Sequence, residues 1–345
     1  MTVALFSRRG IAIPAVAGAL LFTFAVAPPV FASERTVPAT TYKMVDLGTL
    51  GGGISTAQAI NDAGQVVGWS TTKAGTTHAF LWSAGRMLDL GTLGGSQSIA
   101  FDINNRSEVT GYSTTASGVD HMFRWSRGRM TDLGPGDALA INDRGQIVGL
   151  GMPKPGMWTA VRITGTRVTQ LSKFGVSAQY SVANDINASG QIIGSDAGGP
   201  YLLTRDRISR FVRTGVQLST ARAINRRGDV VGFGSFNAGD GRALLWTRTK
   251  TVNLGLISTP TGMTYSEAFG INDKDQVVGI SMTRDGGVHG FVWASGRMTD
   301  LGVVATGGMN GSKAYGINNR GLVVGMSDVG HDAFHAIEWV PEHHR

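Results

Sequence analysis

The stretch DLGTLGGGISTAQAINDAGQVVGWS at residues 46–70 is followed at residues 89–113 by DLGTLGGSQSIAFDINNRSEVTGYS. The two stretches share a Gly-rich opening, a central Ile-Asn pair and a closing apolar run. The Ile-Asn pair recurs along the chain at intervals of 38 to 47 residues. Its asparagines are Asn61, Asn104, Asn142, Asn187, Asn225, Asn272 and Asn318. Seven copies of one unit therefore account for most of the 345 residues.

Each copy predicts four short strands. In the first copy we expect them at residues 57–61, 65–70, 78–82 and 87–90. Apolar residues there alternate with a period of two, and Gly, Asn, Asp and Ser separate the runs. The turn Asn61-Asp62-Ala63-Gly64 suits a hairpin in which glycine takes the left-handed conformation. Four strands in roughly 40 to 45 residues is typical of a propeller blade.

The two ends of the repeat region complement each other. The seventh copy reaches Trp339 without its fourth strand, whereas residues 42–48, YKMVDLG, form such a strand before the first copy. Pairing the two would close a ring and protect its open strand edges. The sequence therefore predicts an all-β fold, a seven-bladed β-propeller of four-stranded blades in which the N-terminal strand, residues 42–48, completes the last blade. A solenoid is the alternative, and it leaves the complementary ends unexplained.

The N-terminal residues have a different composition. Arg8 and Arg9 precede an apolar run at residues 11–27, and Val30-Phe31-Ala32 is typical of a cleavage site, so residues 1–32 are expected to be a signal peptide. We expect a short linker at 33–41, the propeller domain at 42–345, and secretion to the periplasm or medium without stable membrane insertion. The twin-arginine and general export routes both stay open. Because the chain has no cysteine, its stability does not rely on disulfides.

The repeats resemble the HAF repeats of bacterial proteins that are thought to be extracellular. The motif that gives this resemblance is His78-Ala79-Phe80, with variants HMF at 121–123, HGF at 289–291 and HAI at 335–337, together with DLGTLGG. The resemblance covers residues 42–340 and implies export and a repeat fold, but no biochemical activity. The third copy has Thr159-Ala160-Val161 and the fourth has Gly199-Pro200-Tyr201 in the same place. If the histidine had a function in every blade, the third and fourth copies would lack that function.

The repeated polar residues are expected to have structural roles. Serines at the strand entries, Ser55, Ser98, Ser181, Ser219, Ser266 and Ser312, would ring one mouth of the channel and satisfy backbone groups. The asparagines fit turns in which a side chain binds the backbone. The aspartates Asp46, Asp89, Asp132 and Asp300 are expected to order blade contacts.

The sequence shows no catalytic signature. It contains no G-x-S-x-G elbow, phosphate loop, H-E-x-x-H or EF-hand loop, and the lack of cysteine excludes a thiol nucleophile. The repeated histidines fall in separate blades away from the axis, so they cannot share a metal ion. We therefore expect no metal site and no cofactor. Scattered charges without a basic run argue against nucleic acid as a partner.

Function is expected on the face that carries the longer loops, because the copies differ there while their strands hardly change. The candidate binding residues are Trp158, Tyr180, Tyr265, Asp120, Asp240 and Asp285. The leading hypothesis is a monomeric, exported binding or scaffold protein whose ligand is an extracellular polysaccharide or a protein. One alternative is a polysaccharide hydrolase or lyase using residues around Glu267, the main acidic residue at the strand starts near the channel. The second is a structural envelope or matrix component.

Overall fold

The computed structural model describes residues 40–154, 156–213, 216–235, 241–258, 264–305 and 311–342, with only the backbone of 212, 213 and 216–218. Ala39–Arg345 forms one compact unit. The predicted signal peptide and residues 33–39 of the linker lie outside the described residues. Within the described part, no helix is long and apolar enough to cross a membrane.

The first three repeats contain strands β2 to β12, which occur in regular succession. Their bounds are β2 (Gly51–Ile60), β3 (Val66–Thr72), β4 (Thr77–Ser83), β5 (Arg86–Asp89), β6 (Gly94–Ile103), β7 (Val109–Thr115), β8 (Asp120–Ser126), β9 (Arg129–Ile141), β10 (Gln146–Lys154), β11 (Met157–Thr164) and β12 (Arg167–Gln170). A short 3-10 helix (Leu171–Phe174) follows β12. The four strand ranges expected for the first repeat overlap β2, β3, β4 and β5.

The later repeats continue the same order. Their strands are β13 (Val182–Ile186), β14 (Ile192–Asp196), β15 (Gly199–Thr204), β16 (Arg207–Arg210), β17 (Val212–Arg213), β18 (Val216–Ile224), β19 (Val230–Ser235), β20 (Arg242–Trp246), β21 (Thr251–Asn253), β22 (Ser266–Ile271), β23 (Val277–Met282), β24 (Val288–Ala294), β25 (Arg297–Asp300), β26 (Ser312–Ile317), β27 (Val323–Gly330) and β28 (Ala333–Glu342). Strand β1 (Thr41–Asp46) precedes all of them.

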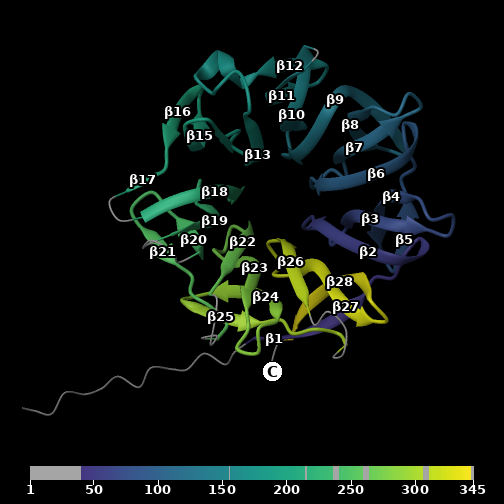
Figure 1. Cartoon of the computed structure of the whole chain (residues 1–345), viewed down its shortest axis with the longest axis vertical. Coiled ribbons are helices and arrows are strands. Elements are labelled where there is room, and N and C mark those ends of the chain that lie inside the picture. The colour runs from purple at the N-terminus through teal and green to yellow at the C-terminus, as the bar shows by residue number, and fades with distance from the viewer. Residues whose placement is uncertain are drawn as a thin grey trace, which may run out of the picture. The chain divides into compact units, whose positions relative to one another are not determined.

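The strands form antiparallel sheets arranged around a common centre (Figure 1). Strands β13 to β16 and β22 to β25 each form a four-stranded sheet in chain order, and β17 to β21 form a five-stranded one. The first three repeats join into one eleven-stranded sheet. Strand β4 makes a parallel bridge to β6, at Thr77 and Gln97, and β9 pairs with β8 through its first half and with β10 through its second half. The expected all-β class is confirmed, with several four-stranded antiparallel sheets.

The predicted pairing of the two ends is confirmed. Strand β1 lies antiparallel to β28, with Thr41 opposite Glu342 and Asp46 opposite Ile337, and it completes the sheet β1-β28-β27-β26. The hydroxyl of Thr41 also donates a hydrogen bond of 2.9 Å to the Glu342 carboxylate. The first strand of the chain therefore covers the outer edge that β28 would otherwise expose.

The repeated asparagines link the inner strand ends into a closed ring. The Asn61 side-chain amide donates to the Asn104 carbonyl at 3.1 Å, and each asparagine bonds to the next in the same way until Asn318 returns to the Asn61 carbonyl at 2.9 Å. The Asn61 side-chain oxygen accepts the backbone N–H groups of Ala63 and Gln65, and so holds its own turn. One side chain thus fixes a turn and a contact between repeats.

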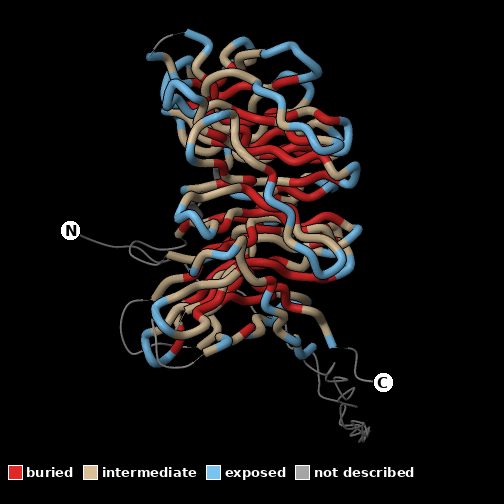
Figure 2. The backbone as a smooth tube through the Cα atoms, turned by 90° about the vertical axis from the view of Figure 1, so that its right-hand side faces the viewer, coloured by how far each residue is buried: buried red, intermediate tan, exposed pale blue. Residues whose placement is uncertain are grey.

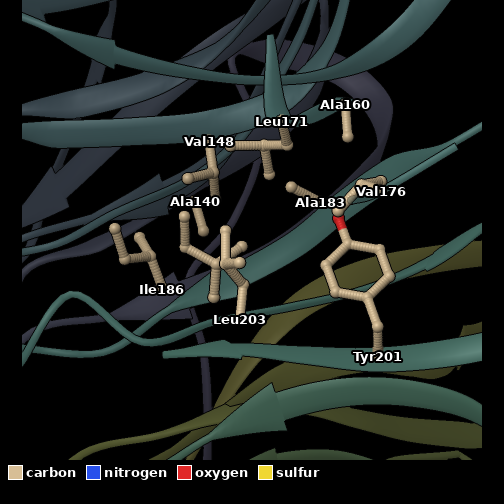
Figure 3. Packing of buried hydrophobic residues seen from close by; sticks show 10 residues of the cluster. Ala140, Val148, Ala160, Leu171, Val176, Ala183, Ile186, Tyr201 and Leu203 are labelled. Atoms are coloured by element: carbon tan, nitrogen blue, oxygen red, sulfur yellow. The ribbon is translucent and has the colours of Figure 1, made fainter. Parts of the chain in front are cut away.

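Apolar side chains fill the space between successive repeats. Buried positions run through the strands and exposed ones gather at the connections (Figure 2). In the cluster of Figure 3, Ala140 and Val148 of the third repeat pack with Ala183 and Tyr201 of the fourth. Tyr201 replaces the phenylalanine of the HAF motif, and both it and Phe80 are fully buried. The aromatic position of the motif is therefore a core position.

A repeated glycine faces a bulge in the innermost strand of its sheet. The pairing of β2 with β3 shifts register between Ala57 and Ala59, opposite Gly68. A Cβ atom at Gly68 would lie 2.0 Å from the Thr56 carbonyl oxygen, which is far inside van der Waals contact. Glycine recurs there because no side chain fits, and the bulge in turn bends the inner strand.

Candidate functional site

The histidine of the HAF motif forms a hydrogen bond to a carboxylate within its own repeat. His78 Nδ1 lies 2.8 Å from the Asp89 carboxylate, which also accepts the Gly91 N–H at 2.8 Å. The same arrangement occurs at His121 with Asp132, His289 with Asp300 and His335 with Asp46. The carboxylate thereby orders the Asp-Leu-Gly turn and ties it to the preceding strand. The repeated aspartates consequently have the ordering role expected of them.

In repeats that lack the HAF histidine, other polar side chains make hydrogen bonds in its place. In the fourth repeat, the Arg210 guanidinium bonds to Asp196 at 2.7 Å. The fifth repeat has Arg242 in the histidine position, which is a third departure from the HAF motif and was not predicted from the sequence. Its guanidinium donates to the Thr264 carbonyl at 3.2 Å. Because several side chains can occupy this position, the histidine is a structural element of the repeat.

The strand-entry serines satisfy backbone groups, as expected. Ser98 Oγ donates to the Gly91 carbonyl at 2.6 Å and accepts the Ala79 N–H at 2.8 Å, so it joins two repeats. Ser55, Ser181, Ser266 and Ser312 make corresponding pairs of bonds. All five are buried, so they lie between repeats and do not ring the channel mouth. Ser219 differs in being exposed.

The sequence-predicted binding residues differ in their exposure. Trp158 in β11 is 40% exposed and Tyr180 is 86% exposed. Asp120, at the start of β8, is also exposed, whereas Asp240 lies outside the described residues. Exposed Asp285 accepts a hydrogen bond from the Thr283 hydroxyl, which lowers the pKa of this carboxyl. In the described ranges, no hydrogen bond or ring contact joins any two of these side chains, so their use as one binding surface stays a prediction.

Tyr265 is the candidate that the structure brings together with other polar side chains. Its hydroxyl donates to the Glu267 carboxylate, whose other oxygen accepts from Arg222 Nε at 2.8 Å. The Arg222 guanidinium lies 5.8 Å from the centre of the Phe269 ring, and the Tyr265 ring lies 5.3 Å from that of Phe233. We call these five residues the mouth cluster. They come from β18, β19 and β22 and from the residue before β22.

The mouth cluster lies at the end of the channel where the longer loops are. Glu267 stands near the start of β22, and Asn272 of the asparagine ring follows its last residue. Strand β23 runs antiparallel to β22, so its connection to β24 lies at the same end as Glu267. Glu267 is buried, whereas the Arg222 side chain is 44% exposed. The cluster therefore presents a cation and three partly exposed rings over a buried carboxylate.

Burial raises the pKa of the Tyr265 hydroxyl, and the hydrogen bond to Glu267 and its charge raise it further. The charge of Arg222 acts in the opposite direction. Tyr265 therefore remains a protonated hydrogen-bond donor at neutral pH. This environment holds the phenol in one orientation, and it opposes use of the tyrosinate as a base.

Two cavities lie one after the other along the channel. One of about 540 Å³ at the ring end is lined by Asp62, Asn105, Asp143, Arg226 and Asp273, among others. The other, of about 200 Å³, lies among the innermost strands. The cavities share three isoleucines, Ile60, Ile271 and Ile317, and are therefore neighbours. In the ranges the structure describes, no group of three or more His, Cys, Asp or Glu side chains could hold a metal ion.

The motif comparison overlooked two carboxylates inside the channel. Asp102 and Asp185 line the smaller cavity, at a position where the other repeats have alanine or glycine. Asp102 accepts the N–H groups of Ile103 and Ile141, each at 2.8 Å, and so joins the second and third repeats. Burial and the charge of Asp185 raise the pKa of Asp102 to about 8. The sequence signal that could have identified these two residues is an aspartate at a position where the other repeats have alanine or glycine.

Comparison with known proteins supports the fold class. No protein-family model matches the chain, and no curated protein matches it. The β-propeller domain of the Trilobed protease from Pyrococcus furiosus is similar in structure, with a TM-score of 0.55 and 9% identity over 84% of this chain and 94% of that one. A catalytically inactive virginiamycin B lyase from Staphylococcus aureus with quinupristin has a TM-score of 0.51 and 12% identity over 88% and 100%. The chain has a β-propeller fold. At these identities, the similarity is informative about fold alone.

Proposed function

We propose that this chain is an exported, seven-bladed β-propeller of the HAF-repeat type that binds an extracellular polysaccharide at its mouth cluster. The closed ring of seven asparagine bonds supports the blade number. The apolar N-terminal run and the HAF motifs support export and the family. The mouth cluster itself is the single observation that carries the binding function.

The mouth cluster has the chemistry that sugar recognition requires. Tyr265, Phe233 and Phe269 offer apolar ring surface for the C–H face of a sugar. Arg222 and Glu267 offer donors and acceptors for its hydroxyl groups, and the ion pair between them holds both side chains in place. The phenol of Tyr265 stays protonated and donates its one O–H to Glu267, so the ring is fixed in place and its oxygen can accept a hydrogen bond from a sugar hydroxyl. The site therefore combines an apolar platform with oriented polar groups.

The division between repeated and variable residues supports the same proposal. The repeated histidines, aspartates, serines and asparagines are engaged in hydrogen bonds to one another and to the backbone that hold the fold. Arg222, Glu267 and Tyr265 have no counterpart at the equivalent positions of the first copy, where Gln58, Thr56 and Ile54 stand. A side chain that the scaffold does not need is available for binding.

A binding role fits this site better than lyase or hydrolase chemistry. A tyrosine that acts as a base needs a lowered pKa, and burial together with Glu267 moves the pKa of Tyr265 upward. Both Glu267 oxygens are engaged, one by Tyr265 and one by Arg222. The carboxylate is thus held as a hydrogen-bonding group of the site.

The test is a retention assay on the chain from residue 33 onward with a panel of cell-wall and extracellular polysaccharides. Bound protein and new chain ends are measured in the same tubes. We expect retention by one polymer class without new ends, and loss of retention in Glu267→Gln with an unchanged melting temperature. New chain ends would support the enzyme alternative. Absence of retention on every polymer would refute the proposal and favour a protein partner or a structural role.

A further inference from the structure

A second site lies deeper in the channel than the mouth cluster. The cavity of about 200 Å³ is bounded by residues of β2, β6, β9, β13, β18, β22 and β26, which are the strands of their repeats nearest the centre (Figure 1). It is large enough for a compact ligand, since its volume equals roughly seven waters at about 30 Å³ each. Its polar and aromatic lining residues come from different repeats. We call this cavity the channel chamber.

One part of the chamber wall is aromatic. Phe101 of β6, Phe269 of β22 and Tyr315 of β26 line it. The Phe269 and Tyr315 rings lie 5.4 Å apart at an interplanar angle of 41°. These positions hold Gln58, Leu139 and other residues in the remaining repeats, so the rings are not part of the repeat pattern. Aromatic faces attract cations through their ring quadrupoles.

The other part of the chamber wall carries Asp102 and Asp185. Asp185 accepts the N–H groups of Ile186 at 2.7 Å and Ile224 at 2.8 Å, just as Asp102 does in its own repeat. Each carboxylate oxygen therefore accepts one backbone hydrogen bond and keeps a further lone pair. Both residues are only partly buried, because they border the cavity.

The chamber carboxylates have no cationic side chain bonded to them in the described ranges. Arg222 also lines the cavity, but its Nε donates to Glu267. Burial raises the pKa of Asp185 to about 6 and, together with the charge of Asp185, that of Asp102 to about 8. The surroundings of each carboxylate thus disfavour its negative charge, and a cation that enters the chamber would offset this cost.

We propose that the channel chamber binds a small organic ammonium ion, with the carboxylates of Asp102 and Asp185 and the rings of Phe101, Phe269 and Tyr315 as its contacts. An organic ammonium ion uses both parts of the wall, because its charge favours the Asp185 carboxylate and the ionised form of Asp102, and its alkyl groups favour the rings. A metal ion fits less well, since the described residues offer no cluster of three metal ligands. The chamber shares Arg222 and Phe269 with the mouth cluster, but its proposed contacts Asp102, Asp185, Phe101 and Tyr315 lie outside that cluster.

Choline and 3,3-dimethyl-1-butanol are a matched pair of probes, because they differ in the charge of one central atom. Titration calorimetry with the chain from residue 33 onward should show binding of choline and none of the neutral alcohol. Asp185→Asn should weaken choline binding by about tenfold or more. Tyr315→Leu, which retains an apolar side chain, should weaken it by a factor of about three to ten.

Asp206→Asn is the control, because Asp206 lies in an exposed turn and its side chain is 54% exposed. Its choline affinity should equal that of the wild type, and all variants should have melting temperatures close to the wild-type value. Equal binding of choline and the neutral alcohol, equal effects of Asp185→Asn and Asp206→Asn, or no heat of binding at millimolar choline would overturn the proposal. If Asp185→Asn fails to fold, Tyr315→Leu and the neutral alcohol still decide it.

Discussion

Replacing one asparagine of the ring should destabilise the protein far more than replacing an exposed turn asparagine. The Asn272 side chain donates to the Asn318 carbonyl at 3.0 Å and to Gln276 at 2.8 Å. Its oxygen accepts the N–H groups of Lys274 and Gln276, both at 3.0 Å. Asn272 is 4% exposed, so water cannot easily replace these partners.

The expected cost follows from the four hydrogen bonds lost in Asn272→Ala. At about 1 kcal/mol net for each bond, the free energy of unfolding should fall by about 4 kcal/mol. The melting temperature should fall by about 8 °C, taking about 2 °C for each kcal/mol in a domain of this size. Urea denaturation followed by tryptophan fluorescence measures the first quantity, and thermal denaturation measures the second.

Asn253→Ala is the matched control, because Asn253 is exposed at the end of β21 and its side chain accepts a hydrogen bond from the Gly255 N–H at 2.9 Å. Its cost should be about 1 kcal/mol or less. If Asn272→Ala costs no more than Asn253→Ala, the asparagine ring does not hold the repeats together, and the reasoning is refuted.

Three further predictions concern pH and ring closure. The hydrogen bond to Asp300 raises the pKa of His289, so the contribution of this contact to the free energy of unfolding should be complete below about pH 6.5 and lost at higher pH. In urea denaturation, His289→Gln should therefore destabilise the protein more at pH 6 than at pH 9. The pKa of Asp102 is raised to about 8, so the free energy of unfolding of the wild type should fall relative to that of Asp102→Asn as the pH rises from 5 to 9. The same pH dependence of this free energy in both proteins would contradict the prediction. A chain that starts at residue 47 lacks β1 and exposes the β28 edge; light scattering should show self-association, whereas a stable monomer would contradict the closure.

The repeat pattern predicted the strands and the pairing of the chain ends because both depend on local periodicity and on counting. Residues 78–82 were expected to form a strand, and β4 spans Thr77–Ser83. The pairing of His78 with Asp89 was not predicted, because period and spacing do not show which side chains meet across two strands. The motif comparison also missed Arg242, since an arginine does not resemble the HAF histidine.

The candidate site was harder to predict than the fold. Tyr265 and Glu267 were each singled out, but their contact with Arg222 joins the fifth and sixth repeats, and the spacing within one repeat does not show which side chains meet across two. Asp102 and Asp185 escaped notice because each stands alone in its repeat. Only the ring arrangement brings residues from different copies to one channel, and a single sequence does not state which of them converge.

The central claim is that repeated residues build the scaffold and variable residues build the site. The most direct test compares retention on the bound polysaccharide for two variants with matched melting temperatures. One carries glutamine at His78, His121, His289 and His335, and the other carries Arg222→Gln, Glu267→Gln and Tyr265→Phe. We predict that the first variant retains wild-type binding and that the second loses it. Loss of binding in the histidine variant with wild-type binding in the mouth-cluster variant would contradict the claim.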